Sequence, residues 1–193
     1  MNEVLKCLKE RRTIRRFLKE QIAEQELQYI LEAGLYAPTA GGRQSPQILV
    51  CQDADVNGRL GRLNRKLFGS ANSDGIHFVS STQRSIADDD SIESGFYDAP
   101  TVVTLFAPER WVYGIHDCTS VAMNMMTAAW SLGIGCCYVS RAEETFRTDL
   151  GRELQQRAGI AEHYVARVHI CMGYPDGEAV AKERKMERIH FIK

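Results

Sequence analysis

The chain has 193 residues, 44% of them hydrophobic, which is enough for a single domain over residues 1–193 with a packed core. Its 24 Lys and Arg side chains nearly balance its 25 Asp and Glu side chains, so the formal net charge is −1. This balance argues against a general binder of nucleic acid or membrane surfaces, because such proteins usually carry an excess of basic residues.

The sequence also bears on the compartment. It has no run of about 18 apolar residues that could span a membrane, and its charged N-terminus lacks the apolar centre of a secretory signal. Six cysteines are scattered without a C-x-x-C pair or zinc-type spacing, which favours free thiols over a disulfide framework or a metal site. We therefore expect a cytoplasmic protein without a metal.

The first third of the chain predicts three helices and one strand. Val4, Leu5 and Leu8 mark one face of a short N-terminal helix. Helical spacing of leucines then predicts a helix over about 24–36, which ends before Pro38 because the residue before a proline disfavours the α conformation. Two further elements follow, a strand over 47–51 and a helix over about 56–67.

The rest of the chain predicts a mixed order of elements. The segment over 69–98 is polar and rich in Ser and Asp, so we expect it to run over the surface. The elements expected after it are a strand over 101–107, a helix from an N-cap at Asp117 to Leu132, a strand over 134–139, a helix over 143–157, a strand over 164–172 and a basic surface tail. This order predicts an α+β fold with about five strands, not a regular βαβ repeat.

The segment Glu10–Phe17, ERRTIRRF, is the sharpest local feature. It places four arginines within six residues, interrupted by Thr13 and Ile14. One interpretation is a solvated charged face. The other is a phosphate site, because guanidinium groups bind phosphate oxygens bidentately and an anion between clustered cations offsets their repulsion.

Three other segments each have an ordinary interpretation beside a functional one. The loop APTAGGRQSP, residues 37–46, is either a plain turn or a place where backbone approaches a flat ligand closely. The segment LGIGCCY, residues 132–138, is either a helix stop followed by a strand or part of a site. In the tail, Lys182 and Arg184 are either solvated charge or further anion ligands.

Taken together and in this order, these segments resemble the FMN-dependent nitroreductase family. The resemblance runs over most of the chain and also includes YDAPTVVTLFA, the helix and strand VAMNMMTAAWSLGIGCCYV, and HICMGYP. It implies a central, mainly antiparallel sheet flanked by helices in an interlocked homodimer, with one FMN at each of two sites along the subunit interface.

The resemblance also assigns residues to the phosphate end and the pyrimidine edge of FMN. Arg11, Arg12 and Thr13 would hold phosphate and ribityl oxygens, and Lys182 and Arg184 would complete the phosphate site. Arg15 would lie near the pyrimidine side of the flavin, and Asn64 at the pyrimidine edge.

The flavin ring itself would be lined from both subunits. Gly135 and Cys136 would face the flavin, with a backbone N–H directed at N5. The partner subunit would contribute Pro38, Thr39, Ala40, Gly42 and Gln44. Many relatives have an asparagine where this chain has Gly42, so a side-chain contact is expected to be absent there. Small residues on the long helix, such as Ala122 and Ala129, would let a partner approach closely.

The implied reaction is carried by the cofactor, because the sequence shows no Ser/His/Asp triad and no carboxylate pair. NADH or NADPH would deliver hydride to flavin N5, and a small electron-poor acceptor such as a nitroaromatic or quinone would then take its place, without nucleic acid or membrane as partner. Two alternatives stay open. One is another reaction on the same fold, such as reductive dehalogenation or flavin fragmentation, and the other is a non-enzymatic phosphate- or nucleotide-binding module.

Overall fold

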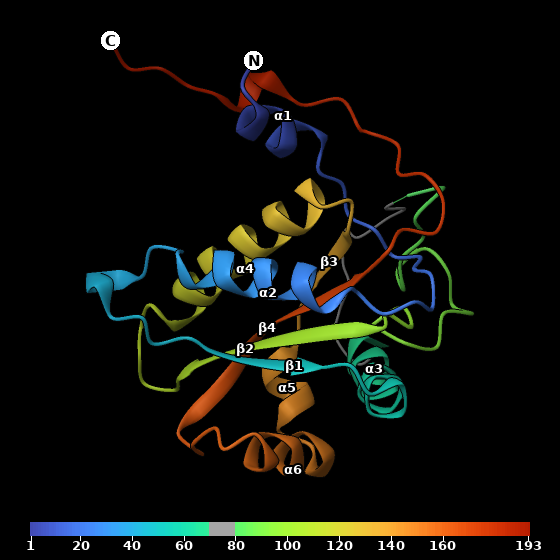
Figure 1. The fold of residues 1–193 in the computed structure, drawn as a ribbon, viewed down its shortest axis with the longest axis vertical. Coiled ribbons are helices and arrows are strands. Elements are labelled where there is room, and N and C mark those ends of the chain that lie inside the picture. The colour runs from blue at the N-terminus through green and yellow to red at the C-terminus, as the bar shows by residue number, and fades with distance from the viewer. Residues whose placement is uncertain (70–79) are drawn as a thin grey trace.

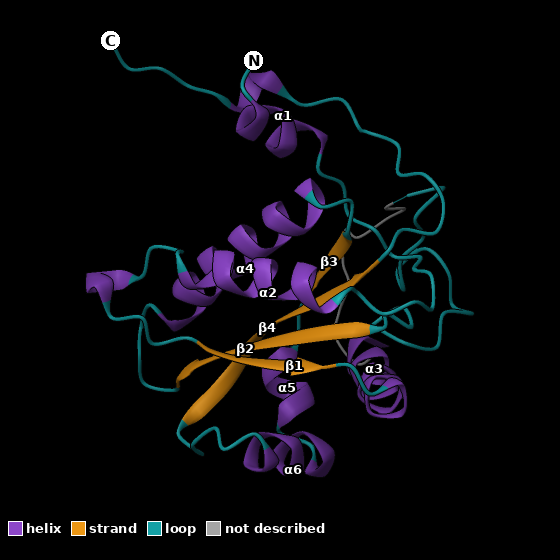
Figure 2. Cartoon of the chain, viewed as in Figure 1, coloured by secondary structure: helices purple, strands orange, loops and turns teal. Residues whose placement is uncertain are grey.

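The computed structural model describes residues 1–69 and 80–193 and has an α+β architecture (Figures 1 and 2). The described residues form four strands in place of the five expected: β1 (Gln47–Cys51), β2 (Thr101–Pro108), β3 (Gly135–Val139) and β4 (Tyr164–Gly173). They make one sheet in the order β1-β2-β4-β3, and every neighbouring pair is antiparallel. The sheet is therefore antiparallel and flanked by helices, as the sequence predicted.

Helices cover both faces of the sheet (Figure 1). On one face lie α2 (Glu24–Leu35) and α4 (Gly114–Ser131), and on the other α3 (Ala54–Gly69), α5 (Ala142–Phe146) and α6 (Asp149–Arg157). Alternating side chains of β2 and β4 enter the two layers, because successive residues of a strand point to opposite faces. Val103 and Leu105 pack toward α4, whereas Val102 and Phe106 belong to the cluster beneath the sheet.

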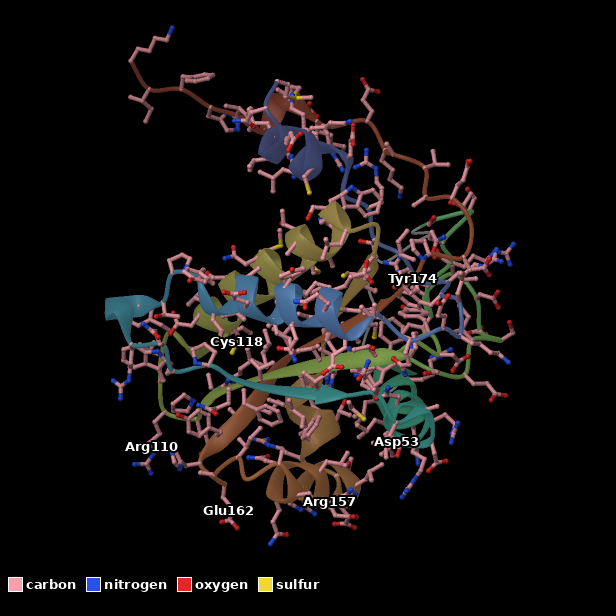
Figure 3. The ribbon with its side chains drawn as sticks, viewed as in Figure 1. Asp53, Arg110, Cys118, Arg157, Glu162 and Tyr174 are labelled. Atoms are coloured by element: carbon pink, nitrogen blue, oxygen red, sulfur yellow. The ribbon has the colours of Figure 1, made fainter. Side chains whose placement is uncertain are left out.

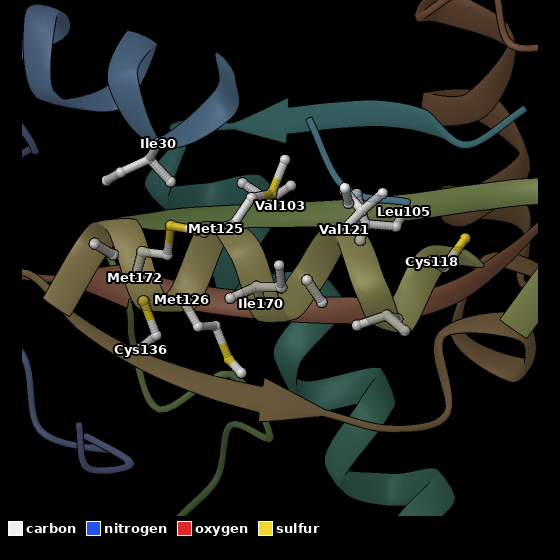
Figure 4. Close-up of a cluster of buried hydrophobic side chains, with 14 of the residues drawn as sticks. Ile30, Val103, Leu105, Cys118, Val121, Met125, Met126, Cys136, Ile170 and Met172 are labelled. Carbon is white, nitrogen blue, oxygen red and sulfur yellow. The ribbon is translucent and has the colours of Figure 1, made fainter. Parts of the chain in front are cut away.

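The helix α4 fills most of the space above the sheet. Figure 4 shows Val121 and Met125 directed at strand residues such as Val103 and Ile170. Ala122 and Ala129 are also fully buried in this core. The expectation that these two alanines admit a partner subunit is therefore wrong, because the core of their own subunit covers them.

Asp117 does not have the capping role that the sequence suggested. The helix α4 begins at Gly114, and Asp117 lies inside its first turn with 3% of its surface exposed. Its carboxylate accepts hydrogen bonds from the backbone N–H of Ala40 at 2.8 Å and from Trp111 Nε1 at 2.8 Å. The aspartate thus joins the loop after α2 to the start of α4.

Two other expectations need correction. The helix expected over 143–157 is two helices, because α5 ends at Phe146 and Thr148 caps α6, its Oγ1 accepting from the N–H of Gly151 at 3.3 Å. In the segment expected to run over the surface, residues 70–79 lie outside the described residues, but Gln83 and Phe96 are only 2% and 1% exposed. This segment is therefore partly core.

Both chain ends lie away from the sheet, on the side of α4 (Figure 1). The N-terminal helix α1 (Glu3–Glu10) exposes Val4, Leu5 and Leu8 and buries none of its residues. The tail after β4 runs past the arginine segment toward α1 and contains a short 3₁₀ helix, η2 (Met186–Arg188). Within the described ranges, no helix combines the length and apolar character needed to cross a membrane.

Candidate functional site

The arginine segment is fastened along the edge of β3. Thr13 forms a parallel bridge with Cys136, and the N–H of Ile14 donates to the Cys136 carbonyl at 2.9 Å. Ile14 is buried against Gly135, where a Cβ would lie only 2.7 Å from the Cβ of Ile14. The apolar insertion in ERRTIRRF is thus the anchor that holds the neighbouring arginines in place.

The tail is anchored beside the same edge. Tyr174, labelled in Figure 3, follows β4; its hydroxyl donates to Glu26 Oε2 at 2.6 Å, and its carbonyl accepts from the N–H of Leu18 at 2.9 Å. Phe17 bridges Pro175 in the next step of the chain. These contacts direct the tail across the arginine segment.

Segments far apart in the sequence therefore meet at a cationic pocket of about 240 Å³. It is lined by Arg11, Arg12, Thr13, Arg15, Ser80, Gln83, Ala179, Val180, Lys182 and Arg184. The structure thus brings Arg15 together with all five residues that the resemblance assigned to the phosphate end, namely Arg11, Arg12, Thr13, Lys182 and Arg184. Among the described residues, no carboxylate lines this pocket.

The cations of this pocket differ in how they are held. Arg12 Nη1 donates to the carbonyls of Lys9 and Arg11 at 2.6 and 2.8 Å, so it is tied to the end of α1. Within residues 1–69 and 80–193, no hydrogen bond or ion pair engages the side chains of Arg11, Lys182 or Arg184. These three charges are therefore free to bind an anion.

Arg15 connects the cationic pocket to a second pocket. Its Nη1 donates to the carbonyl of Gln83 at 3.1 Å, its guanidinium lies 5.8 Å from the centre of the Tyr97 ring, and its Nε is buried without a hydrogen-bond partner in the described part of the chain. The second pocket measures about 140 Å³ and is also lined by Asn64, Tyr97 and residues 137–141.

A third pocket of about 210 Å³ adjoins the second, because Tyr138, Ser140 and Arg141 line both. The three pockets therefore follow one another from the tail, past Arg15, to the C-terminal end of β3. A ligand with an anionic end and a larger body could extend along this line. The sequence analysis missed Tyr138, Ser140 and Arg141; their one sequence signal is that they end a predicted strand and begin the loop after it, where binding residues often lie.

Gly135 and Cys136 line none of these three pockets. Gly135 is covered by Ile14, and the Cys136 side chain lies in the core between the sheet and α4 (Figure 4). Burial raises the pKa of the Cys136 thiol, and it raises the pKa of Cys137 to about 11. Both cysteines are therefore protonated at neutral pH.

Asn64 is buried beside the second pocket and has a clear structural contact. Its Nδ2 donates to the carbonyl of Ser140 at 3.0 Å and to Thr145 Oγ1 at 3.1 Å. These bonds fix the turn between β3 and α5. The amide nitrogen is thus committed to the backbone that shapes the pocket.

The loop Pro38–Gln44 lies at the opposite end of the subunit from the arginine segment (Figure 1). It contains the 3₁₀ turn η1 (Ala40–Gly42), where Gly42 has a φ of 62° that suits glycine. Asp117 holds Ala40, and the N–H of Gln44 donates to Thr39 Oγ1 at 2.9 Å. None of the five residues assigned to the partner's ring site lines the three pockets of its own subunit.

Comparisons with known proteins identify the family and the fold of the chain. The sequence profile described as the Nitroreductase family matches residues 8–174. A protein of Archaeoglobus fulgidus named as an NADH dehydrogenase/NAD(P)H nitroreductase, an assignment made by inference, is 28% identical over 92% of this chain and 88% of its own.

Solved structures extend the likeness to the fold. A nitroreductase with bound FMN from Desulfitobacterium hafniense has a TM-score of 0.84 at 22% identity and covers 100% of both chains. An iodotyrosine deiodinase bound to FMN and 3-iodo-L-tyrosine has a TM-score of 0.73 at 18% identity over 98% of this chain and 99% of the other.

Proposed function

The chain belongs to the nitroreductase family, and we propose that it is an FMN-dependent oxidoreductase that takes electrons from NADH or NADPH. The observation that supports this most directly is the cationic pocket, where Arg11, Lys182 and Arg184 have no partner in the described chain and no described carboxylate is present. A phosphate monoester carries about −1.5 to −2 charges at neutral pH and would neutralise these cations.

The remaining pockets suit the rest of FMN. Arg15 offers a buried Nε–H that has no acceptor among the described residues, as expected for a donor that meets an oxygen or nitrogen of a ligand. The second and third pockets continue from Arg15 along the end of β3. We therefore place the ribityl chain and the pyrimidine edge beyond Arg15, toward Asn64 and Ser140.

We further propose that a homodimer completes the site. The ring-lining loop lines none of the three pockets of its own subunit, so it would serve the partner's site. Apolar side chains that the single subunit leaves exposed, including Leu5, Leu8, Leu35 and Tyr36, provide surface that a partner would cover. We propose the reducing cytoplasm as its location, since all six cysteines are free thiols.

Bound in this site, FMN would supply the chemistry, accepting hydride from NAD(P)H and passing electrons to an electron-poor acceptor such as a nitroaromatic or quinone. The residues of the chain would bind, orient and polarise. The guanidinium of Arg15 would place positive charge beside the pyrimidine edge, where it favours negative charge that develops during hydride transfer. The protonated thiols of Cys136 and Cys137 have no step to perform.

The test is a flavin titration followed by reduction without oxygen. Purified protein should bind FMN with a shifted visible absorbance, lose that absorbance on addition of NADH or NADPH, and regain it when a quinone or nitroaromatic is added. Comparing both donors and several acceptors would identify the preferred pair. Protein that binds no FMN would contradict the proposal and favour a phosphate-binding module without redox activity.

The likeness to iodotyrosine deiodinase favours one second candidate, reductive dehalogenation. The same reduced protein distinguishes the two reactions. Release of halide from a halogenated phenol, with slow reoxidation by nitroaromatics and quinones, would support the second candidate over the first.

A further inference from the structure

Arg43, in the loop Pro38–Gln44, is an exposed arginine that rests on a tryptophan. Its guanidinium lies 4.7 Å from the centre of the Trp111 ring, a distance at which the face of the ring attracts a cation. Within the described residues, the Arg43 side chain has no hydrogen bond or ion pair. Its N–H donors are therefore held in one place and are free to bind a ligand.

Trp111 is itself fastened to this loop. Its Nε1 donates to Asp117 Oδ2 at 2.8 Å, and the backbone N–H of Ala40 donates to Oδ1 of the same carboxylate at 2.8 Å. The Trp111 and Tyr113 rings also meet edge to face, with their centres 5.3 Å apart. The loop, Trp111 and Arg43 therefore form one unit around a buried carboxylate.

The backbone on both sides of Arg43 has an uncommon conformation. Gly42 and Gln44 have φ values of 62° and 49°, both in the left-handed region. Glycine adopts this region readily, but a glutamine rarely does, and backbone strain of this kind is concentrated at functional sites. The N–H of Gln44 is satisfied by Thr39 Oγ1 at 2.9 Å. The loop thus holds a strained shape in which Arg43 meets Trp111.

This unit has no place in the site of its own subunit. Arg43, Trp111 and Tyr113 line none of the three pockets. The proposed function assigns the loop Pro38–Gln44 to the flavin ring of the partner's site, so residues bonded to the loop would lie beside that ring too. The cofactor phosphate has its own cations in the cationic pocket, and the oxidised flavin ring carries no charge. Arg43 is therefore available to a molecule that binds over the ring.

We propose that Arg43 is a catalytic residue that binds, in the partner's site, the oxygen of a quinone or nitroaromatic that receives the electrons. This inference rests on the proposed function and deepens it. A quinone that accepts a hydride from the reduced cofactor becomes a hydroquinone monoanion, and its charged oxygen then takes a proton from water. A guanidinium beside that oxygen stabilises the charge as it develops. Trp111 is a positioning residue, because it holds the guanidinium in place.

The first test measures binding without turnover, by calorimetry of FMN-loaded protein in the absence of NAD(P)H. The probes, in mildly alkaline buffer, are neutral nitrobenzene and 4-nitrophenolate, whose negative charge is shared with its nitro oxygens. The phenolate should bind about ten- to a hundredfold more tightly, as expected for charge-assisted hydrogen bonds. Arg43→Gln should bring this preference to near unity with FMN affinity unchanged. Arg43→Lys keeps the charge without the planar fork and should keep part of the preference.

The second test separates the two half-reactions by stopped-flow absorbance. In Arg43→Gln, reduction of bound FMN by NADH or NADPH should stay within about twofold of the wild type. Reoxidation by a quinone should slow by roughly ten- to a hundredfold, less than for an enclosed oxyanion donor because Arg43 is exposed. Trp111→Phe keeps a ring beneath the guanidinium and should slow reoxidation by at most about threefold, whereas Trp111→Leu should approach Arg43→Gln.

Arg110 offers a matched control. This exposed arginine, labelled in Figure 3, precedes Trp111 in the chain but does not stack on a ring within the described residues, and it lines none of the three pockets. Arg110→Gln should keep the probe preference and the reoxidation rate within about twofold, because salt screens an exposed charge that makes no contact. Equal losses in Arg110→Gln and Arg43→Gln would reveal a general effect of charge and contradict the role of Arg43.

The outcomes separate this inference from the proposed function. A chain that binds no FMN contradicts the proposed function, and the role of Arg43 falls with it. FMN-loaded protein that binds both probes equally, or that keeps its preference in Arg43→Gln, contradicts the role of Arg43 alone. The same holds if Arg43→Gln loses FMN affinity or is reduced slowly by NAD(P)H, since Arg43 would then serve the cofactor or the electron donor.

Discussion

Arg11 and Arg16 belong to the same short segment but have different surroundings, so they make a matched pair for testing the phosphate site. Arg11 lines the cationic pocket, and no hydrogen bond or ion pair of its side chain occurs within the described residues. Arg16 lies outside that pocket and pairs with Asp176 at 2.8 Å, with 59% of its side chain exposed. Replacing each by alanine removes one charge from the segment in both cases.

The two variants should differ in FMN binding. Loss of a charge-assisted hydrogen bond costs about 1.5–3 kcal/mol, so Arg11→Ala should weaken FMN binding by roughly ten- to a hundredfold. Its thermal stability should stay close to that of the wild type, because the side chain makes no hydrogen bond or ion pair within the described residues. Arg16→Ala should keep FMN affinity within about twofold, since Arg16 does not line the pocket and the exposed ion pair that it loses contributes at most about 1 kcal/mol to stability.

The assay is fluorescence titration of each protein with FMN and with riboflavin, which lacks the phosphate. Arg11→Ala should lower affinity for FMN and leave affinity for riboflavin unchanged, so the ratio of the two dissociation constants should shrink. Equal losses for both flavins would place Arg11 away from the phosphate. Unchanged FMN affinity in a folded variant would refute the reasoning.

Three further variants test the loop, the dimer and the core. Asp117→Ala removes a buried carboxylate that accepts two hydrogen bonds, so the free energy of unfolding in urea should fall by about 3–5 kcal/mol; a fall below about 1 kcal/mol would mean that the loop does not depend on it. Met123 on α4 is 40% exposed and is one of the apolar side chains that we expect a partner subunit to cover, so Met123→Arg should give a monomer in sedimentation with no flavin absorbance; a monomer that keeps its flavin would contradict the shared site. Burial lowers the pKa of His169 to about 3, below the value of about 6.5 in the unfolded chain. The stability that comes from keeping this imidazole neutral is therefore fully present above pH 6.5, and the free energy of unfolding falls by about 1.4 kcal/mol for each pH unit below it. In urea titrations between pH 7 and 4.5, the free energy of unfolding should depend less steeply on pH in His169→Leu than in the wild type. Equal pH dependence in the two proteins would show that His169 is not the cause.

The sequence predicts the elements whose apolar pattern is continuous, and it misses those that depend on distant contacts. Strands such as Gln47–Cys51 are confirmed because a short, continuous apolar run is typical of a strand. The break between α5 and α6 has no Gly or Pro to mark it and depends on Thr148 as a cap. The burial of Gln83 depends on its Oε1, which accepts from the backbone N–H of Arg15 at 2.7 Å, a contact between distant segments.

The candidate site also contains residues that the sequence predicted and residues that it missed. The convergence of Arg11 and Arg15 with Lys182 and Arg184 was expected from the family resemblance, because no local pattern brings the tail to the N-terminal segment. Arg141 was missed because nothing in its neighbours marks a left-handed residue there. Only the structure shows that Arg141 lines two adjoining pockets.

Each proposed site takes its arginine segment from one subunit and its loop Pro38–Gln44 from the other, and this has a consequence for dimers of two different variants. If the arginine segment serves its own cofactor and the loop held by Asp117 serves the partner's, then Arg11→Ala and Asp117→Ala damage different halves of each shared site. A dimer with one subunit of each kind would carry both defects in one site and neither in the other. At an FMN concentration too low to load either variant alone, co-expression of the two variants should therefore restore up to half of the activity per mixed dimer, which is intersubunit complementation.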